Sequence, residues 1–105
     1  MPTQQQIERF TLAFHRVAVQ RLRNEPDLRR QAQQVLDRWD ANSPSPSGEG
    51  YRAKWRELLD GDIDWLAFIV CADNEQAATL RGVSPLGFLL GESERLRIRC
   101  AAMAA

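Results

Sequence analysis

Apolar side chains recur at every third or fourth position through most of this chain, and no stretch alternates apolar and polar residues as a half-buried strand would. A spacing of three to four residues matches the helical period of 3.6, so these side chains line one face of a helix. The clearest case spans residues 3–24, where one broad face holds Ile7, Phe10, Ala13, Phe14, Val17, Ala18 and Leu22. The pattern predicts an all-α fold of five or six short helices.

Capping residues and prolines place the first two helices. Thr3 and Gln6 have the spacing of a capping box, which predicts a helix over residues 3–24. Pro26 suits the first turn of a second helix that ends at Trp39. Because only a short turn joins these helices, we expect residues 1–39 to form an antiparallel helical hairpin.

The segment DANSPSPSGEG, residues 40–50, has two Pro, two Gly and three Ser, and it contains no large apolar side chain. This composition is typical of an exposed loop, so we expect residues 40–50 to be flexible. The loop separates residues 1–39 from the helices of residues 51–105. Since the first piece is too small to bury a core alone, we interpret residues 1–105 as one domain.

Four helices are expected after that loop. The first contains Tyr51, Trp55, Leu58 and Leu59 and ends in a left-handed cap at Gly61. Asp62 is expected to cap an apolar segment that we interpret as a buried helix, although residues 65–72 could also form a strand. Asp73 and Gln76 suggest a capping box for a helix that reaches Arg81 and is stopped by Gly82.

The last helix is expected to start near Glu92. Its most apolar positions are Leu96, Cys100 and Met103, which are spaced as one helical face. We therefore expect these three side chains to face the core.

Composition and charge narrow the function classes. The chain has 14 basic and 14 acidic residues, and this zero net charge argues against a dedicated nucleic-acid or polybasic membrane binder. No secretion signal or apolar run of about 20 residues is present, so we expect a cytoplasmic protein. With one His and two Cys, we expect no metal site and no cofactor. His15 is expected to be structural or exposed, and Cys71 and Cys100 to be buried.

No nucleophile elbow, phosphate loop or zinc signature is present, so we do not expect an enzyme. Two pairs of acidic residues, Asp62 with Asp64 and Glu92 with Glu94, lie at predicted helix starts. Acidic side chains are favoured at these positions, so a capping role explains them. Arg9, Arg16 and Arg23 recur every seven residues and are interpreted as the solvated back of a helix.

The three tryptophans are expected to anchor the core, with Phe14, Leu36 and Trp65 buried together. Trp39 also fits a second role, because it borders the predicted loop and could be an exposed contact for a partner.

The segment RGVSPLGFLL supplies the remaining candidate site. Pro85 and Gly87 interrupt regular structure among several apolar side chains, which cannot all point inward from one irregular segment. One interpretation is a loop folded over the core. The other is an exposed patch that binds another protein, with Arg81 reaching outward beside it. On that interpretation the partner-binding residues are Arg81, Ser84, Pro85, Leu86, Phe88, Leu89 and Trp39.

The order of elements ends in NEQAATLRGVSPLGFLLGESERLRI, after a helix ending near a Trp, a polar loop and a Trp-containing helix. This order resembles small all-helical bacterial antitoxin-like proteins that are encoded beside a toxin gene. The resemblance spans Phe14 to Ile98 and is most specific over Leu80 to Ile98. It implies an antitoxin or small chaperone that masks a partner, and it supplies no catalytic residue.

We therefore expect a non-catalytic protein-binding module. Its partner would be a co-encoded toxin or effector, or a second copy of this chain. The alternative is a small helical DNA-associated transcriptional regulator that uses the arginines of the first two helices.

Overall fold

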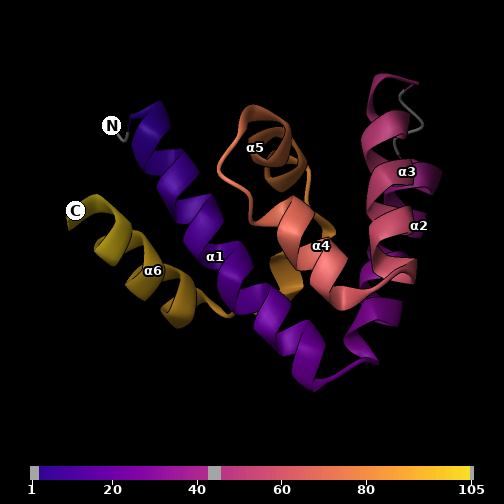
Figure 1. Cartoon of the computed structure of the whole chain (residues 1–105), viewed down its shortest axis with the longest axis horizontal. Helices are drawn as coiled ribbons and strands as arrows, with labels where there is room; N and C mark the ends of the chain where they lie inside the picture. Colours follow the sequence, from indigo (N-terminus) through magenta and orange to yellow (C-terminus); the bar gives the residue numbers. More distant parts are fainter. Residues whose placement is uncertain (1–2, 43–45, 105) are drawn as a thin grey trace.

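The computed structural model describes residues 3–42 and 46–104, and this part of the chain forms helices and connecting turns without a strand (Figure 1). The all-α prediction is confirmed. The elements in chain order are α1 (Gln4–Asn24), α2 (Leu28–Asn42), α3 (Pro46–Asp60), α4 (Ile63–Val70), α5 (Glu75–Gly82), the 3-10 helix η1 (Pro85–Leu89) and α6 (Glu92–Ala104).

Helix α1 is the central element of the domain. It contacts α4 and α5 on one side and α6 on the other (Figure 1). The predicted capping box is present at its start, because Thr3 Oγ1 accepts a hydrogen bond from the Gln6 amide at 3.1 Å and the Gln6 side chain accepts one from the Thr3 amide at 2.9 Å. These two bonds satisfy backbone donors that the first turn of a helix leaves without partners.

Helices α1 and α2 follow each other through a short turn, but α2 packs mainly against α3 and η1. The two helices diverge from the turn (Figure 1), so the prediction that they pack together as an antiparallel hairpin is wrong. Ion pairs join α2 to α3: Arg56 contacts Asp37 at 2.8 Å and Asp40 at 2.6 Å, and Arg52 also contacts Asp40. These contacts favour α3 as the neighbour of α2.

The predicted loop over residues 40–50 is largely helical. Asp40 lies in the last turns of α2, and α3 begins at Pro46, where a proline costs no hydrogen bond. The composition is misleading here because Gly and Pro disfavour the interior of a helix, whereas Pro is favoured in its first turn. The part of the predicted loop over residues 43–45 lies outside the described residues.

Three of the predicted helix ends differ in detail. Asn74, not Asp73, caps α5, since its side chain accepts a hydrogen bond from the Ala77 amide at 2.8 Å. Gly61 does not adopt a left-handed conformation, and Gly82 lies within α5 rather than after it. The predicted cap at Asp62 is confirmed by its hydrogen bond with the Asp64 amide at 2.6 Å.

The core is built around Trp55, which is fully buried. Its indole Nε1–H donates a hydrogen bond to the Leu80 carbonyl at 3.0 Å, which joins α3 to α5. Phe14 and Leu36 are buried as predicted, but Trp65 is 51% exposed, so its predicted place in the core is wrong. Leu66 and Val70 are the residues of α4 that occupy the core instead.

Helix α6 packs through the face opposite to the predicted one. Leu96, Cys100 and Met103 are exposed, whereas Ile98 and Ala102 face inward. The guanidinium groups of Arg95 and Arg99 lie over the rings of Phe14 and Phe10, at 5.3 Å and 5.2 Å from the ring centres. A small residue and two stacked arginines therefore form the contact with α1, and the most apolar stripe is left outside.

Candidate docking cleft

The segment that the sequence singled out as a docking surface is mostly buried. Its residues Pro85, Leu86 and Leu89 lie in the core, in agreement with the interpretation as a segment folded over it. The 3-10 helix begins at Ser84, whose hydroxyl accepts a hydrogen bond from the Leu86 amide at 3.1 Å. Phe88 points the other way and is 42% exposed. Of the predicted contact residues in this segment, Phe88 alone is exposed.

Arg81 was expected to reach outward, and the structure contradicts this, because only 5% of the residue is exposed. Its Nη1 donates hydrogen bonds to the carbonyls of Val70 at 2.7 Å and Ala72 at 2.9 Å. These carbonyls belong to the end of α4, where a helix lacks internal donors. Burial lowers the pKa of the Arg81 guanidinium. Arg81 is a structural residue that joins α5 to the end of α4.

Trp39, the remaining predicted contact, lies on the outer part of α2 and is 36% exposed. The groove beside Phe88 has a volume of about 480 Å³, lies between η1 and the α1–α2 turn, and is not lined by Trp39. The structure therefore does not bring the predicted site residues together into one accessible site.

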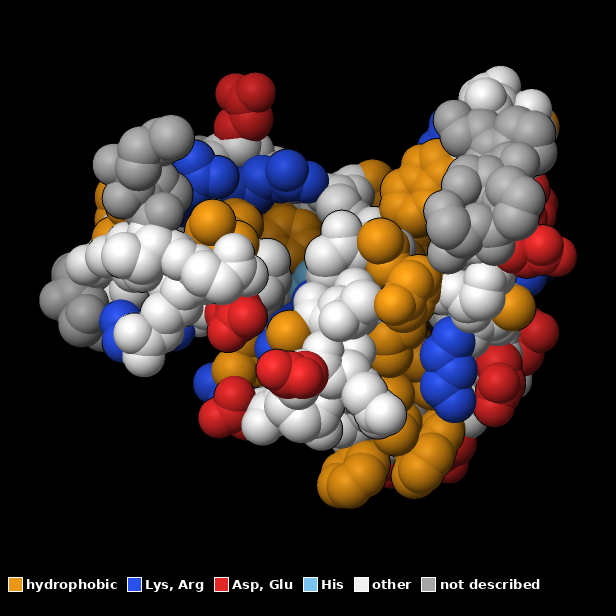
Figure 2. Space-filling model, turned by 90° about the horizontal axis from the view of Figure 1, so that it is seen from above, with side chains coloured by type: hydrophobic (Ala, Val, Ile, Leu, Met, Phe, Trp, Pro, Cys, Tyr) orange, Lys and Arg blue, Asp and Glu red, His pale blue; other side chains and the backbone are white. Residues whose placement is uncertain are grey.

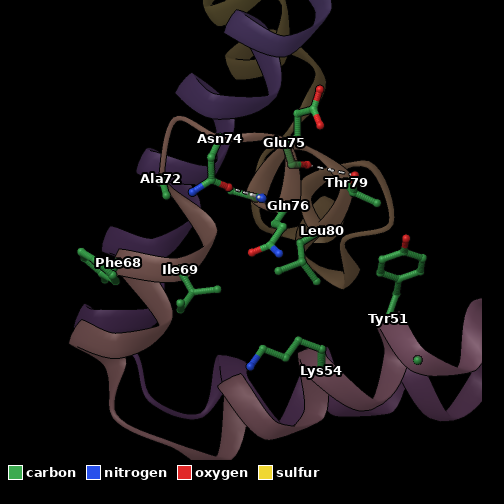
Figure 3. A pocket seen from close by; sticks show the side chains of 12 residues that line it. Tyr51, Lys54, Phe68, Ile69, Ala72, Asn74, Glu75, Gln76, Thr79 and Leu80 are labelled. Atoms are coloured by element: carbon green, nitrogen blue, oxygen red, sulfur yellow. Dashed lines mark hydrogen bonds between the residues drawn. The ribbon is translucent and has the colours of Figure 1, made fainter.

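A larger cleft lies where α3, α4 and α5 meet, with a volume of about 710 Å³. Tyr51 and Lys54 form its α3 wall, and Ile69 points into it from α4 (Figure 3). Gln76 and Leu80 of α5 form the opposite wall. Because the Leu80 carbonyl is held by Trp55, the core fixes the position of this wall.

The outer edge of the cleft carries an exposed aromatic pair. Trp65 and Phe68 lie three residues apart on α4, and their rings stack at a centroid distance of 5.7 Å with an angle of 21° between the planes. Phe68, which is 68% exposed, also lines the cleft. In the view of Figure 2, hydrophobic side chains form a band down this side of the molecule that ends in protruding side chains. An exposed apolar pair beside a cleft makes this edge the candidate contact site of the domain.

Sequence reasoning missed this site, although a signal for it was present. Apart from Asp64, the segment IDWLAFIV is apolar, and an eight-residue helix on the outside of a small domain can bury only one side. With Leu66 and Val70 inside, Trp65 and Phe68 must face outward. Which side faces the core depends on α1 and α3, and the segment itself does not encode that choice.

Charged groups stand at the two ends of the cleft. Lys54 lies at one end and Glu75, in the first turn of α5, at the other (Figure 3). The Lys54 ammonium is 3.7 Å from the Glu57 carboxylate, and both side chains are solvated. Hence the cleft offers apolar walls with a few polar groups that can orient an occupant.

His15 and the two cysteines lie outside the cleft. His15 is buried, and its Nδ1–H donates to the Thr11 carbonyl at 2.7 Å. Burial lowers the pKa of His15 to about 4, so the ring is neutral at pH 7. Of the cysteines, Cys71 is half-buried and Cys100 is exposed, so both are less buried than expected. In the described ranges, no three His, Cys, Asp or Glu side chains are grouped to hold a metal ion.

The arginine stripe of α1 is exposed, as predicted for a solvated helix back. Arg23 forms an ion pair with Asp64 at 2.5 Å, which joins the end of α1 to the start of α4. The Arg23–Asp64 ion pair places the end of the arginine stripe next to α4, the helix that carries Trp65 and Phe68.

Comparison of the chain with protein families, curated proteins and solved structures gives no match. Over residues 3–42 and 46–104, no helix has both the length and the apolar character to cross a membrane.

Proposed function

We propose that this chain is a non-catalytic protein-binding module, and that the cleft between α3, α4 and α5 receives an apolar segment of another protein. The observation that carries the proposal is the exposed Trp65–Phe68 pair at the edge of this cleft. Aromatic side chains are the residues most often responsible for binding energy at protein interfaces. Here they stand on a helix that core residues and capped ends hold in place.

The most concrete form of this function is an antitoxin-like inhibitor or chaperone of a co-encoded bacterial protein. The resemblance over Leu80 to Ile98 supports it, but those residues serve mainly to build the core and α6. The docking surface would therefore lie on α4, within the resembling region Phe14 to Ile98 but outside its most specific part.

The test is co-expression of this chain with the product of each adjacent reading frame, followed by affinity purification and titration calorimetry. We expect one product to bind and Phe68→Asp to weaken binding by at least about 30-fold, as expected for an interface hot spot worth 2 kcal/mol or more. Val83→Asp is the matched control, because Val83 is exposed and does not line the cleft.

Circular dichroism must show that both variants keep the helical content of the wild type. Binding by neither neighbouring product, or equal binding by wild type and Phe68→Asp, would overturn the proposal.

A further inference from the structure

The two most exposed large apolar side chains in the described chain are Phe68 and Leu96, at 68% and 62%. Phe68 stands at the cleft, whereas Leu96 belongs to the outside of α6. Together with Cys100 and Met103, Leu96 forms an exposed row, which we call the outer stripe of α6. The domain therefore has two unpartnered apolar surfaces of different shape, a concave cleft and a convex helix face.

The outer stripe has the spacing of a helix that docks into a groove. Its residues stand at positions i, i+4 and i+7, the anchor pattern of an amphipathic helix whose apolar face fills an apolar cleft. The opposite face of α6 already packs on α1 through Ile98 and Ala102. Hence α6 can offer the stripe to a second molecule without leaving its own domain.

The charges on the two surfaces are complementary. Glu92 lies one turn before Leu96 on the line of the stripe and is exposed. Arg99 flanks the stripe one turn before Met103; it is exposed as a residue, and its guanidinium keeps its charge while it lies over the Phe10 ring of its own domain. About 10 Å of helix separates the two positions, at 1.5 Å per residue. The cleft has Lys54 at one end and Glu75 at the other (Figure 3). A helix that places Glu92 beside Lys54 places Arg99 toward Glu75, so each charge meets its opposite.

We infer that the outer stripe of α6 docks into the cleft of a second copy of this chain. This inference rests on the proposed function, since it uses the same cleft for protein docking. Helix α6 lies on one side of α1, and the helices α3, α4 and α5, which form the cleft, lie on the other side (Figure 1), so the contact is head-to-tail. A head-to-tail contact joins copies into rings or open chains as concentration rises. One helix in one cleft is a small interface, and we expect a dissociation constant above about 1 µM.

The first measurement is sedimentation equilibrium from about 10 µM to about 1 mM, the range of a weak association. A reductant is included, because Cys100 is exposed and could form an adventitious disulfide. We expect the average mass of the wild type and of Val83→Asp to rise with concentration. Leu96→Asp and Phe68→Asp should each associate at least tenfold more weakly. A wild type that stays monomeric, or a Leu96→Asp or Phe68→Asp variant that associates like it, overturns the inference.

The second measurement mixes the two aspartate variants. Leu96→Asp keeps an intact cleft and Phe68→Asp keeps an intact stripe, so the mixture should form a one-to-one complex that does not grow further. Recovery of this complex supports the pairing of stripe with cleft. A mixture that stays monomeric while the wild type associates would show that the stripe of one copy does not pair with the cleft of another, and would overturn the inference.

The orientation has its own test. Lys54→Glu should weaken self-association, and adding Glu92→Lys to that variant should restore it. Loss without restoration contradicts the proposed direction of α6 in the cleft.

Failure of this inference is distinguishable from failure of the proposed function. Leu96→Asp should still bind the co-encoded protein, because its cleft is intact. If the wild type does not self-associate but binds that protein through Phe68, the self-pairing is wrong and the proposed function stands.

Discussion

Trp55 and Trp65 allow a direct test of how the core is built, because they are the same residue type in opposite environments. Trp55 is fully buried among the residues of the core, whereas about half of Trp65 is exposed. Replacing each by alanine removes the same atoms. The difference in the free energy of unfolding therefore reports the environment alone.

The expected cost of Trp55→Ala follows from its contacts. Loss of a buried tryptophan costs about 3–5 kcal/mol through lost burial and the cavity left behind. Loss of the hydrogen bond from Nε1 adds about 1 kcal/mol or less, since the Leu80 carbonyl keeps a second donor, the Val83 amide at 3.2 Å. A domain of this size has about 5–15 kcal/mol in total, so this variant should be close to unfolding. Trp65→Ala loses mainly its stacking on Phe68 and should cost about 1 kcal/mol or less.

The assay is urea unfolding followed by circular dichroism at 222 nm, which does not depend on the tryptophan that is removed. Trp55→Phe keeps most of the ring and gives an intermediate point if Trp55→Ala is unfolded. A loss above about 2 kcal/mol for Trp65→Ala, or below about 1 kcal/mol for Trp55→Ala, would refute this account of the core.

Two further predictions concern buried polar groups. Burial lowers the pKa of His15 from 6.5 to about 4, so the unfolded chain binds a proton that the folded chain excludes between these values. The contribution of this group to the free energy of unfolding is complete above pH 6.5, and about 3 kcal/mol of it is lost as the pH falls toward 4. In a pH series of urea melts, His15→Phe should therefore show a weaker dependence of stability on pH over this range. Arg81→Met removes the two hydrogen bonds to the end of α4 and should cost about 2–4 kcal/mol, measured by thermal unfolding; an unchanged melting temperature would contradict the structural role of Arg81.

Features that depend on neighbouring residues in the chain could be predicted from the sequence. The capping box of Thr3 and Gln6 and the cap at Asp62 are local hydrogen bonds, and both are present. The apolar period also predicted most of the helices and the all-α fold. These signals are strong because a helix end must satisfy its backbone donors close by in the chain.

Features that depend on distant parts of the chain could not be predicted. The apolar spacing in α6 favours an inward face with Leu96, yet Ala102 and Ile98 face inward. This orientation also places Arg95 and Arg99 over the rings of Phe14 and Phe10 on α1, a contact between distant parts of the chain. The sequence predicts Arg81 to be exposed, whereas in the fold its guanidinium is buried and donates hydrogen bonds to two carbonyls at the end of α4. The exposure of Trp65 likewise depends on which side of α4 meets α1, and that is a property of the assembled fold.

The most direct test of the docking cleft is whether a partner covers Trp65. In a Trp39→Phe variant, Trp65 is the accessible tryptophan, since Trp55 is fully buried. Acrylamide quenching of its fluorescence should fall when the proposed partner, a neighbouring gene product prepared in a tryptophan-free form, is added to saturation at a low chain concentration. Equal quenching of the free and saturated protein would contradict the assignment of the docking site to this cleft.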